Sequence, residues 1–596
     1  MHNLPATREL VKFALECYRS DLDDALTEKI KSLIFDQIGL QIGCATLPWS
    51  RTTYKYHAMR SFHGNCHSTV AYYGDKLNPE QAAFINACFG HAQDFDDTCL
   101  KVQTHPGAVI IPVALAIAEE TGASGEQFMK AIVAGMEVML RVAHSVSPGC
   151  LQRGHHTPQA TGPFGSAITA GLLLGLNEEQ LLHAMGIAGS FSGGLIEYTQ
   201  SGGSVKRIHT AIPTTAGIRA AYFAADGMTG PVTVLEGKKG FCTVYSDTTD
   251  LARLTDRLHE RYLIHEVALK YYNCCYFIHA PLEATLQLTR EHGLAPDSIR
   301  SIRVGTSKHG TVHVGRIKEP HDALGAQFSV QYTLALALLK EIPGLESYED
   351  ENLWNPEIRS YAAKVDVFED PVCSAEYPEN WGSVVEIETY DGRTFVNRVR
   401  FPIGNPENPM SADEIRSKFM RNVKGKISES QAESLYRKIG SLESVAEIGE
   451  LTRLLVAPRE QSAHVATSRG ARPTAARRPG RRSPRAPFRT EVSLRFNGTV
   501  VSGTSVDVGH GGMFVASESH VTEGLPVELV IALPAHSLPI QAKGRIAWVN
   551  STSQPKKPGF PTGFGVEFLD LQETACELFP TFVDNYISAD YSCANN

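Results

Sequence analysis

The sequence has no paired-cysteine pattern, no secretion signal and no run apolar enough to cross a membrane. Its twelve cysteines are scattered without a single CxxC, which argues against a disulfide framework and an iron–sulfur cluster. The first 50 residues carry charged side chains throughout, so a signal-peptide core is missing. The longest charge-free run, 157–177, contains Pro163 and several glycines and predicts a buried helix. We therefore expect a soluble cytoplasmic protein with no membrane span.

Signals for binding nucleotides or nucleic acids are also scarce in the first 458 residues. There is no GxGxxG fingerprint, and Gly203-Ser-Val-Lys206 lacks the GxxxxGK[ST] spacing of a phosphate-binding loop. A net charge of −9 argues against nucleic acid as a partner. The stretch 459–489 is the exception, with nine arginines against one acid. Because no aromatic residue for base stacking is interleaved with its arginines before Phe488, we interpret it as a solvated linker.

Length and pattern together indicate a multidomain protein. A chain of 596 residues exceeds one ordinary core. Apolar residues at three- and four-residue spacing predict helices in Leu10–Leu15, Ile30–Ile42 and Phe128–Ala143. Asp391-Gly392, between two alternating stretches, predicts a β-hairpin. The expected organisation is an all-α domain (1–264 and 405–457), an α+β domain (265–404), a linker (458–480) and a small all-β domain (481–596).

Within the last domain, alternating apolar residues and Gly/Pro turns predict a set of short strands. A closing helix is expected over Ala575–Tyr586. The predicted strands are Glu491–Phe496, Met513–Val515, Val527–Leu533, Ile540–Val549 and Gly565–Phe568.

The most informative stretch is 91–107, H-A-Q-D-F-D-D-T-C-L-K-V-Q-T-H-P-G. Carboxylates this close are costly to bury, since like charges raise one another's pKa. Histidine transfers protons near neutral pH, and a nearby carboxylate fixes its tautomer. The stretch therefore predicts an acid–base centre, whose candidate groups are Asp94, Asp96, Asp97, Thr98 and His105.

Three other interpretations of this stretch need weighing. An acidic loop that caps a helix explains the carboxylates without any chemistry, and a divalent-cation site is a second alternative. Asp94–Thr98 also fits the DxDxT pattern of haloacid-dehalogenase-type phosphatases. That pattern requires a preceding strand, whereas Ala82–Gly90 predicts a helix.

Three further polar clusters lie in otherwise apolar surroundings. Buried cations need partners, so lysines and histidines here favour an anionic substrate over a metal. Each cluster also has a plain structural explanation, as a helix cap, a surface charge or a core cysteine. The clusters are His155–His156, Lys206-Arg207-Ile208-His209, and Lys270 to His279 with Cys274 and Cys275.

Residues 4–457 resemble the MmgE/PrpD family. The resemblance rests on eight ordered motifs: D-F-D-D-T…T-H-P-G (94–107), G-M-E-V…R (135–141), H-T-P-Q-A-T-G-P-F-G-S-A (156–167), S-V-K-R-I-H (204–209), L-E-G-K-K-G-F (235–241), K-Y-Y-N-C-C-Y-F-I-H (270–279), A-Q-F-S-V-Q-Y (326–332) and N-P-E-N-P-M-S (405–411). It implies a helical domain, an α+β lid with the substrate between them, and a homodimer. No cofactor or metal is implied.

The resemblance also places the family's site residues on this chain. It implies catalytic roles for Asp94, Thr98, His105, His156, Lys206 and Lys270. Substrate contacts are expected at Arg207, His209, Cys275 and His279. The chain departs from the family at Asn273-Cys-Cys-Tyr276, where the dehydratases have A-E-F-H and the decarboxylase has a histidine near Cys275.

Residues 481–570 resemble a PilZ barrel, a family that includes cyclic di-GMP receptors with an RxxxR arm and a [DN]xSxxG turn. Gly509 replaces the serine of that turn, which removes a hydroxyl contact. A barrel retained for protein contacts is the alternative. Nucleotide contacts are predicted at Arg481, Arg482, Arg485, Asp507, Gly509 and Gly512.

The leading functional prediction is a cofactor-independent lyase that dehydrates 2-methylcitrate or a similar tricarboxylate, with a C-terminal regulatory or docking domain. A cis-aconitate-type decarboxylase and an iminodisuccinate-type epimerase are alternatives that use the same residues. A catalytically silent scaffold that responds to cyclic di-GMP is an alternative of another class.

Overall fold

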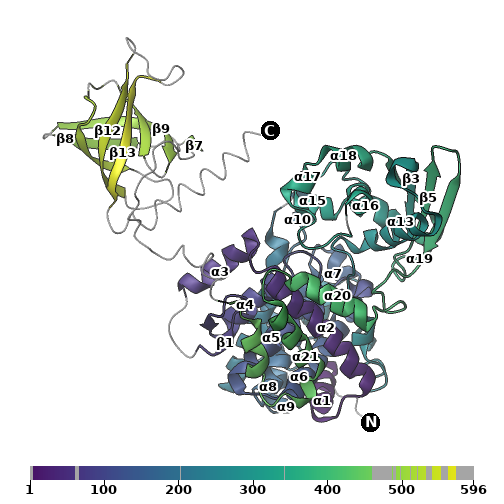
Figure 1. Ribbon diagram of the computed structural model, residues 1–596. Helices are drawn as coiled ribbons and strands as arrows, with labels where there is room; N and C mark the ends of the chain where they lie inside the picture. Colours follow the sequence, from purple (N-terminus) through teal and green to yellow (C-terminus); the bar gives the residue numbers. More distant parts are fainter. Residues whose placement is uncertain are drawn as a thin grey trace. The chain divides into compact units, whose positions relative to one another are not determined.

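The computed structural model describes residues 5–60, 66–201, 203–340 and 342–458, followed by the strand regions between 486 and 571. The chain forms two compact units, Met1–Gly470 and Ala471–Asn596 (Figure 1). No helix among the described residues is long and apolar enough to span a membrane.

The first unit is built around closely packed helices. The longest is α6, whose start is fixed by a capping box between Ser124 and Gln127. Gly135 lets α6 approach α8, because a Cβ there would lie 1.8 Å from Thr169 Oγ1. The helices before residue 250 are α1 (Ala6–Arg19), α2 (Asp24–Gly43), α3 (Pro48–Arg60), α4 (Pro79–Gly90), α5 (Pro106–Thr121), α6 (Gly125–Val146), α7 (Gly149–Gln152), α8 (Thr157–Leu173), α9 (Glu178–Ala188), α10 (Tyr198–Ser201), α11 (Ile212–Ala225) and α12 (Phe241–Tyr245).

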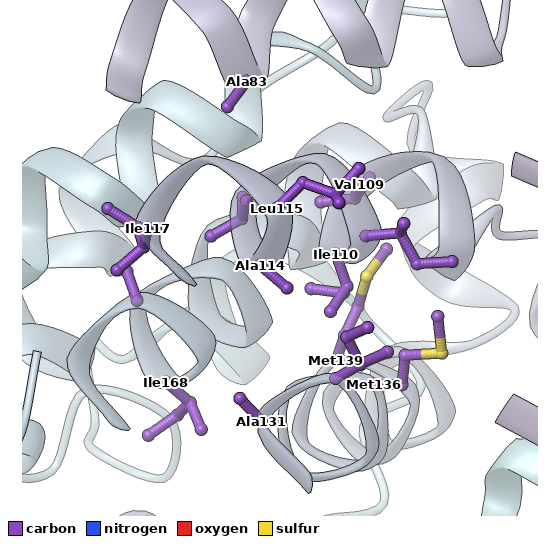
Figure 2. Close-up of a cluster of buried hydrophobic side chains, with 14 of the residues drawn as sticks. Ala83, Val109, Ile110, Ala114, Leu115, Ile117, Ala131, Met136, Met139 and Ile168 are labelled. Atoms are coloured by element: carbon purple, nitrogen blue, oxygen red, sulfur yellow. The ribbon is translucent and has the colours of Figure 1, made fainter. Parts of the chain in front are cut away.

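The core of these helices is aliphatic. Figure 2 shows side chains of α4, α5, α6 and α8 meeting there, among them Ala83, Ile110, Met139 and Ile168. Apolar burial of this kind contributes about 25 cal/mol per Å² to folding. Later helices add Phe419 and Leu435 to the same core, and α20 packs directly on α2. They are α20 (Ala412–Val423), α21 (Glu429–Gly440) and α22 (Gly449–Thr452).

A second apolar core lies in the intervening residues, around a four-stranded sheet of order β4-β3-β5-β6. β3 (Ile299–Thr306) pairs in parallel with β4 (Val365–Glu369), and β5 (Ser383–Thr389) and β6 (Thr394–Val399) add antiparallel. The predicted hairpin at Asp391-Gly392 is confirmed, since Gly392 has the positive φ of 85° that the turn requires. The helices here are α13 (His279–His292), α14 (Lys308–Val314), α15 (Ala323–Gln327), α16 (Val330–Leu339), α17 (Asp350–Leu353), α18 (Pro356–Ala362) and α19 (Pro371–Glu376).

The second unit is an antiparallel barrel. Six strands close in the order β10-β13-β12-β11-β8-β9 and back to β10, and β7 pairs outside with β9. The two-residue β7 and the barrel strand β9 are absent from the sequence prediction, β9 because Gly503 and neighbouring polar residues interrupt its alternation. The predicted helix over Ala575–Tyr586 lies outside the described residues. The strands are β7 (Ala486–Pro487), β8 (Glu491–Phe496), β9 (Thr499–Gly509), β10 (Gly512–Ala516), β11 (Pro526–Ile531), β12 (Ile540–Asn550) and β13 (Gly563–Leu571).

Candidate functional site

Two helix ends position the acidic loop. α4 ends at Gly90, so His91 takes the C-cap position, and α5 begins at Pro106 with His105 as its N-cap residue. The loop between them turns sharply at Asp94, whose φ of 53° lies in the left-handed region. The two imidazoles and the carboxylates between them are thereby brought together in the interior of the first unit.

Two ammonium groups converge on one oxygen of Asp94. Lys206 Nζ lies 2.8 Å from Asp94 Oδ1, and Lys270 Nζ lies 3.1 Å from the same atom. Lys206 is carried by the short 3-10 helix Val205–Ile208. Burial alone would raise the pKa of Asp94, but the two lysines outweigh it and hold that pKa well below its ordinary value. Asp94 is therefore ionised, and the two buried ammonium groups beside it carry more charge than its single carboxylate can neutralise.

The two ring nitrogens of His105, the catalytic candidate, have different neighbours: Nε2 lies near Asp94, and Nδ1 contacts the acidic loop. Its Nε2 lies 3.8 Å from Asp94 Oδ1. Its Nδ1 lies 2.8 Å from the Asp97 carbonyl oxygen and 3.1 Å from Asp96 Oδ2. Because both neighbours of Nδ1 are acceptors, Nδ1 carries the hydrogen and Nε2 faces Asp94.

A second imidazole shares the Asp96 carboxylate. His91 Nδ1 lies 2.9 Å from Asp96 Oδ2, and the rings of His91 and His105 are 4.7 Å apart. Burial lowers the pKa of His91 to about 4 although Asp96 opposes it. Burial would raise the pKa of Asp96, but the two histidines lower it well below its ordinary value. The carboxylate therefore orients two imidazoles at once.

Asp97 is a buried carboxyl of a different kind. Its Oδ2 accepts a hydrogen bond from Gly107 N at 2.8 Å, which ties the loop to the first turn of α5. Gln37 Nε2 lies 3.5 Å from Oδ1. Burial, assisted by the charge of Asp96, raises the pKa of Asp97 to about 7. Asp97 thus supports the loop and does not face the lysines.

The histidine pair His156 and His209 lies on the side of Lys206. Their Nδ1 atoms are 3.0 Å apart, so one ring donates and the other accepts. Burial lowers both pKa values, that of His209 to about 4, and Lys206 lowers them further. The Tyr198 ring contacts both imidazoles, with centroids 5.7 and 5.6 Å away. The pair is uncharged in this state.

Arg207 lies beside Lys206 in the chain and is 8% exposed. Its guanidinium stacks on the Trp49 ring, 3.9 Å from the centroid. Among the described residues, no carboxylate or carbonyl accepts a hydrogen bond from it.

The remaining predicted residues occupy less direct positions. Thr98 pairs through its backbone with Ala268, which brings the segment of Lys270 to the loop. Burial raises the pKa of the Cys275 thiol to about 11, and Asp94 adds to the shift. His279 stacks on Tyr276, with ring centroids 4.6 Å apart. Cys275 is thus within electrostatic range of Asp94. The rings that His279 contacts instead belong to the second core.

A lysine from the far end of the unit holds the loop and the Lys270 segment together. Lys418, on α20, donates to the carbonyl oxygens of Phe95 (3.0 Å) and Lys270 (2.6 Å). Its ammonium also lies 2.5 Å from Asp36 Oδ1. This contact connects residues that are 323 and 148 positions away in sequence.

Four side chains of the loop lie close enough to ligate a metal ion, with ligand atoms within 4.8 Å of one another: His91, Asp94, Asp96 and His105. The ammonium groups of Lys206 and Lys270 already lie at Asp94. A divalent cation would be repelled by both, so this donor set fits a metal poorly and an anionic ligand well.

In the barrel, Asp507 Oδ1 accepts a hydrogen bond from Phe514 N at 3.0 Å, across the β9–β10 turn. Gly509 ends β9 and Gly512 begins β10, so both predicted turn glycines flank this connection. Arg481, Arg482 and Arg485 lie outside the described residues.

Comparison with known proteins agrees with these observations. The chain matches the MmgE/PrpD N-terminal domain over residues 8–254 and the MmgE/PrpD C-terminal domain over 272–442. A PilZ domain matches residues 479–584. The chain belongs to the MmgE/PrpD family and carries a PilZ domain behind it, which confirms both resemblances.

The curated relatives are lyases by name. A cis-aconitate decarboxylase of Aspergillus terreus is 29% identical over 76% of this chain and 96% of its own length. The cis-aconitate decarboxylase of Mus musculus is 27% identical over 74% and 91%. A mitochondrial 2-methylcitrate dehydratase of Yarrowia lipolytica is 24% identical over 45% and 54%. The Bacillus subtilis inhibitor of motility (MotI/DgrA) has a TM-score of 0.15, too low to bear on fold or function.

Sequence reasoning missed several groups of this site, among them His91 and Trp49. His91 ends a helix and was not distinguished from an ordinary cap, although His91 and Asp96 are only five residues apart. Trp49 is 158 positions from Arg207, and an aromatic–guanidinium stack leaves no spacing signal.

The raised pKa of Asp97 makes stability depend on pH. A carboxyl whose pKa is about 7 when folded and about 3.9 when unfolded loses its stabilising contribution as pH rises between these values. We expect the free energy of unfolding of Asp97→Asn to rise by up to about 3 kcal/mol, relative to that of the unmodified protein, as the pH increases from 5 to 8. Thermal unfolding at both pH values measures this gain as a growing difference in Tm.

Asp391→Asn is the matched control, because the pKa of Asp391 is lowered to about 2 and its titration ends below pH 5. A Tm difference for Asp97→Asn that stays constant from pH 5 to pH 8 contradicts the prediction.

Proposed function

We propose that this chain is a lyase that acts on a small polycarboxylate by proton transfer at imidazole. The observation that carries the proposal is the convergence of Lys206 and Lys270 on Asp94, with His105 Nε2 beside them. Buried ammonium groups next to a proton-transfer group suit a substrate that develops negative charge as it reacts.

The charge balance supports an anionic substrate. Lys206, Lys270 and Arg207 carry three positive charges, whereas Asp94 and Asp96 supply two negative ones, so one positive charge is left over. Buried charges are stable only when they are paired. A ligand with several carboxylates supplies the missing negative charge.

The same groups serve two reaction courses. In dehydration, a base takes the proton from carbon, the C–H electron pair becomes the second bond of the alkene, and the hydroxyl leaves as water after receiving a proton. In decarboxylation, the C–C bond to one carboxylate breaks and CO2 leaves, the bonding electrons stay on the substrate, and one proton is added at carbon. Lys206 and Lys270 stabilise the charge of either intermediate, while His105 exchanges the proton.

The remaining groups complete this assignment. Dehydration needs a second group that delivers a proton to the leaving hydroxyl, and His91, on the same carboxylate as His105, is proposed for that role. His156 and Thr98 are proposed to complete the catalytic set, and His209, Cys275 and Arg207 to contact the substrate. His279 is proposed to support this surface from the second core.

Two substrates have support of different kinds. The Aspergillus terreus and Mus musculus relatives, which match over more than nine-tenths of their length, are named cis-aconitate decarboxylases, which favours decarboxylation of a cis-aconitate-like tricarboxylate. The Yarrowia relative is named a 2-methylcitrate dehydratase, which keeps dehydration as the second candidate. Epimerisation of iminodisuccinate requires only the proton exchange.

Proton NMR in D2O with 2-methylcitrate, citrate, cis-aconitate and iminodisuccinate tests the proposal. Itaconate formed from cis-aconitate indicates decarboxylation, a new alkene from 2-methylcitrate indicates dehydration, and deuterium exchange alone indicates epimerisation. Because His105 exchanges the proton, we expect His105→Ala to lower turnover by about 10²- to 10⁴-fold.

The exposed His292, on α13, provides the control variant His292→Ala, which should retain full turnover. Circular dichroism checks that both variants are folded. If the unmodified protein converts none of the four compounds, or if His105→Ala is fully active, the proposed function is contradicted.

We further propose that the PilZ domain binds cyclic di-GMP. The supporting observation is Asp507, which lies in β9 two residues before Gly509 and accepts a hydrogen bond from Phe514 N across the β9–β10 turn. Guanidinium groups suit phosphate and guanine acceptor edges, so Arg481, Arg482 and Arg485 are the proposed arm.

Calorimetry with the full-length chain tests this second proposal. We expect saturable binding of cyclic di-GMP that Arg485→Ala weakens at least tenfold, since a charge-assisted contact contributes about 1.5–3 kcal/mol. Arg393→Ala, on the exposed β5–β6 turn of the first unit, is the control. No binding heat with the unmodified chain refutes the proposal.

A further inference from the structure

Two hydrogen-bond donors near the candidate site have no acceptor among the described residues. Trp49 Nε1 has no hydrogen-bond partner in the part of the chain that the structure describes. The Arg207 guanidinium, 3.9 Å from the ring of that tryptophan, has none there either. Both are donors only, so neither can satisfy the other.

Packing alone does not account for this pair. A cation over an indole ring gains about 0.5–2 kcal/mol, whereas an uncompensated buried charge is strongly destabilising. Buried arginines normally have carboxylate or carbonyl partners. Arg141 in the same unit follows that rule, because it donates to the carbonyl oxygens of Asp256 and Arg261 and pairs with Glu137.

The position of the pair connects it to the reaction centre. Arg207 follows Lys206 directly, and both residues are largely buried, with exposed fractions of 8% and 9%. Burial lowers the pKa of Arg207, and the charge of Asp94 opposes this lowering, so the two groups are within electrostatic range. Asp94 itself is already paired with Lys206 and Lys270.

We propose that Arg207 and Trp49 form a carboxylate subsite, which binds a substrate carboxylate remote from the one that reacts at Lys206 and Lys270. The guanidinium offers two parallel N–H donors to a carboxylate, and the indole N–H offers a third. Binding at a remote carboxylate positions the reacting carbon beside His105. The inference rests on the proposed function only for the class of ligand, a polycarboxylate.

Calorimetry with propane-1,2,3-tricarboxylate, which has neither a hydroxyl to lose nor an alkene, measures the subsite without turnover. We expect Arg207→Met to weaken binding about tenfold or more, because a charge-assisted hydrogen bond is lost. Trp49→Phe keeps an aromatic ring under the guanidinium but removes the N–H, and should weaken binding by a smaller factor. The double variant should lose less than the product of the two factors, because both donors hold one carboxylate.

The second core offers a matched control pair. Arg359 also stacks on a tryptophan, Trp354, at 4.9 Å, but it donates to the carbonyl oxygens of Pro320 and Leu353. Trp354→Phe should leave the affinity for the tricarboxylate unchanged.

Thermal unfolding without ligand separates a binding role from a structural one. Removing a largely buried charge that has no hydrogen-bond acceptor should leave Tm unchanged or higher in Arg207→Met, whereas loss of a structural contact lowers it. A lower Tm with unchanged affinity overturns the subsite, and so does the absence of tricarboxylate binding to the unmodified protein.

The outcome is distinguishable from failure of the proposed function. If the unmodified protein binds the tricarboxylate and Arg207→Met does not, but NMR detects no reaction, the subsite is supported and the proposed function is contradicted. If NMR detects turnover and Arg207→Met binds the tricarboxylate as tightly as the unmodified protein does, the proposed function is supported and the subsite is contradicted.

Discussion

The ion-pair cluster at Asp94 is the constraint on which the candidate site depends. Two ammonium groups and a carboxylate are stable in the interior only if their geometry is held accurately, because each charge alone is costly to bury. The protein meets this requirement from three distant segments. The left-handed turn supplies Asp94, a short 3-10 helix supplies Lys206, and the segment bridged to Thr98 supplies Lys270.

Around this cluster, buried carboxylates of equal chemistry have different tasks. Asp94 stays ionised because lysines face it, and Asp96 stays ionised because two imidazoles do. Burial, assisted by the charge of Asp96, outweighs the hydrogen bond from Gly107 at Asp97, so its pKa rises to about 7. The surroundings of each aspartate therefore decide its role: Asp94 pairs with the lysines, Asp96 orients the imidazoles and Asp97 supports the loop.

Much of this arrangement was predictable from sequence. The helical and sheet regions follow from periodicity and from the Asp391-Gly392 turn, and ordered motifs placed Asp94, His105, Lys206 and Lys270 before any geometry was known. The limits have physical causes. β9 was missed because glycine and polar residues break the alternation that marks a strand. His91 and Trp49 were missed because their roles arise from contacts that tertiary packing creates, and the arginine arm lies outside the described residues.

The contact of Lys418 has a consequence for the order of events during synthesis. Phe95 and Lys270 leave the ribosome long before α20 does, yet their carbonyl oxygens are held together by a side chain of that helix. A nascent chain that ends before residue 418 lacks this clamp, whatever its helices have already formed. We therefore expect the site to be assembled only after some 420 residues have emerged, so that the enzyme acquires its charge cluster as a late step, shortly before the barrel is translated.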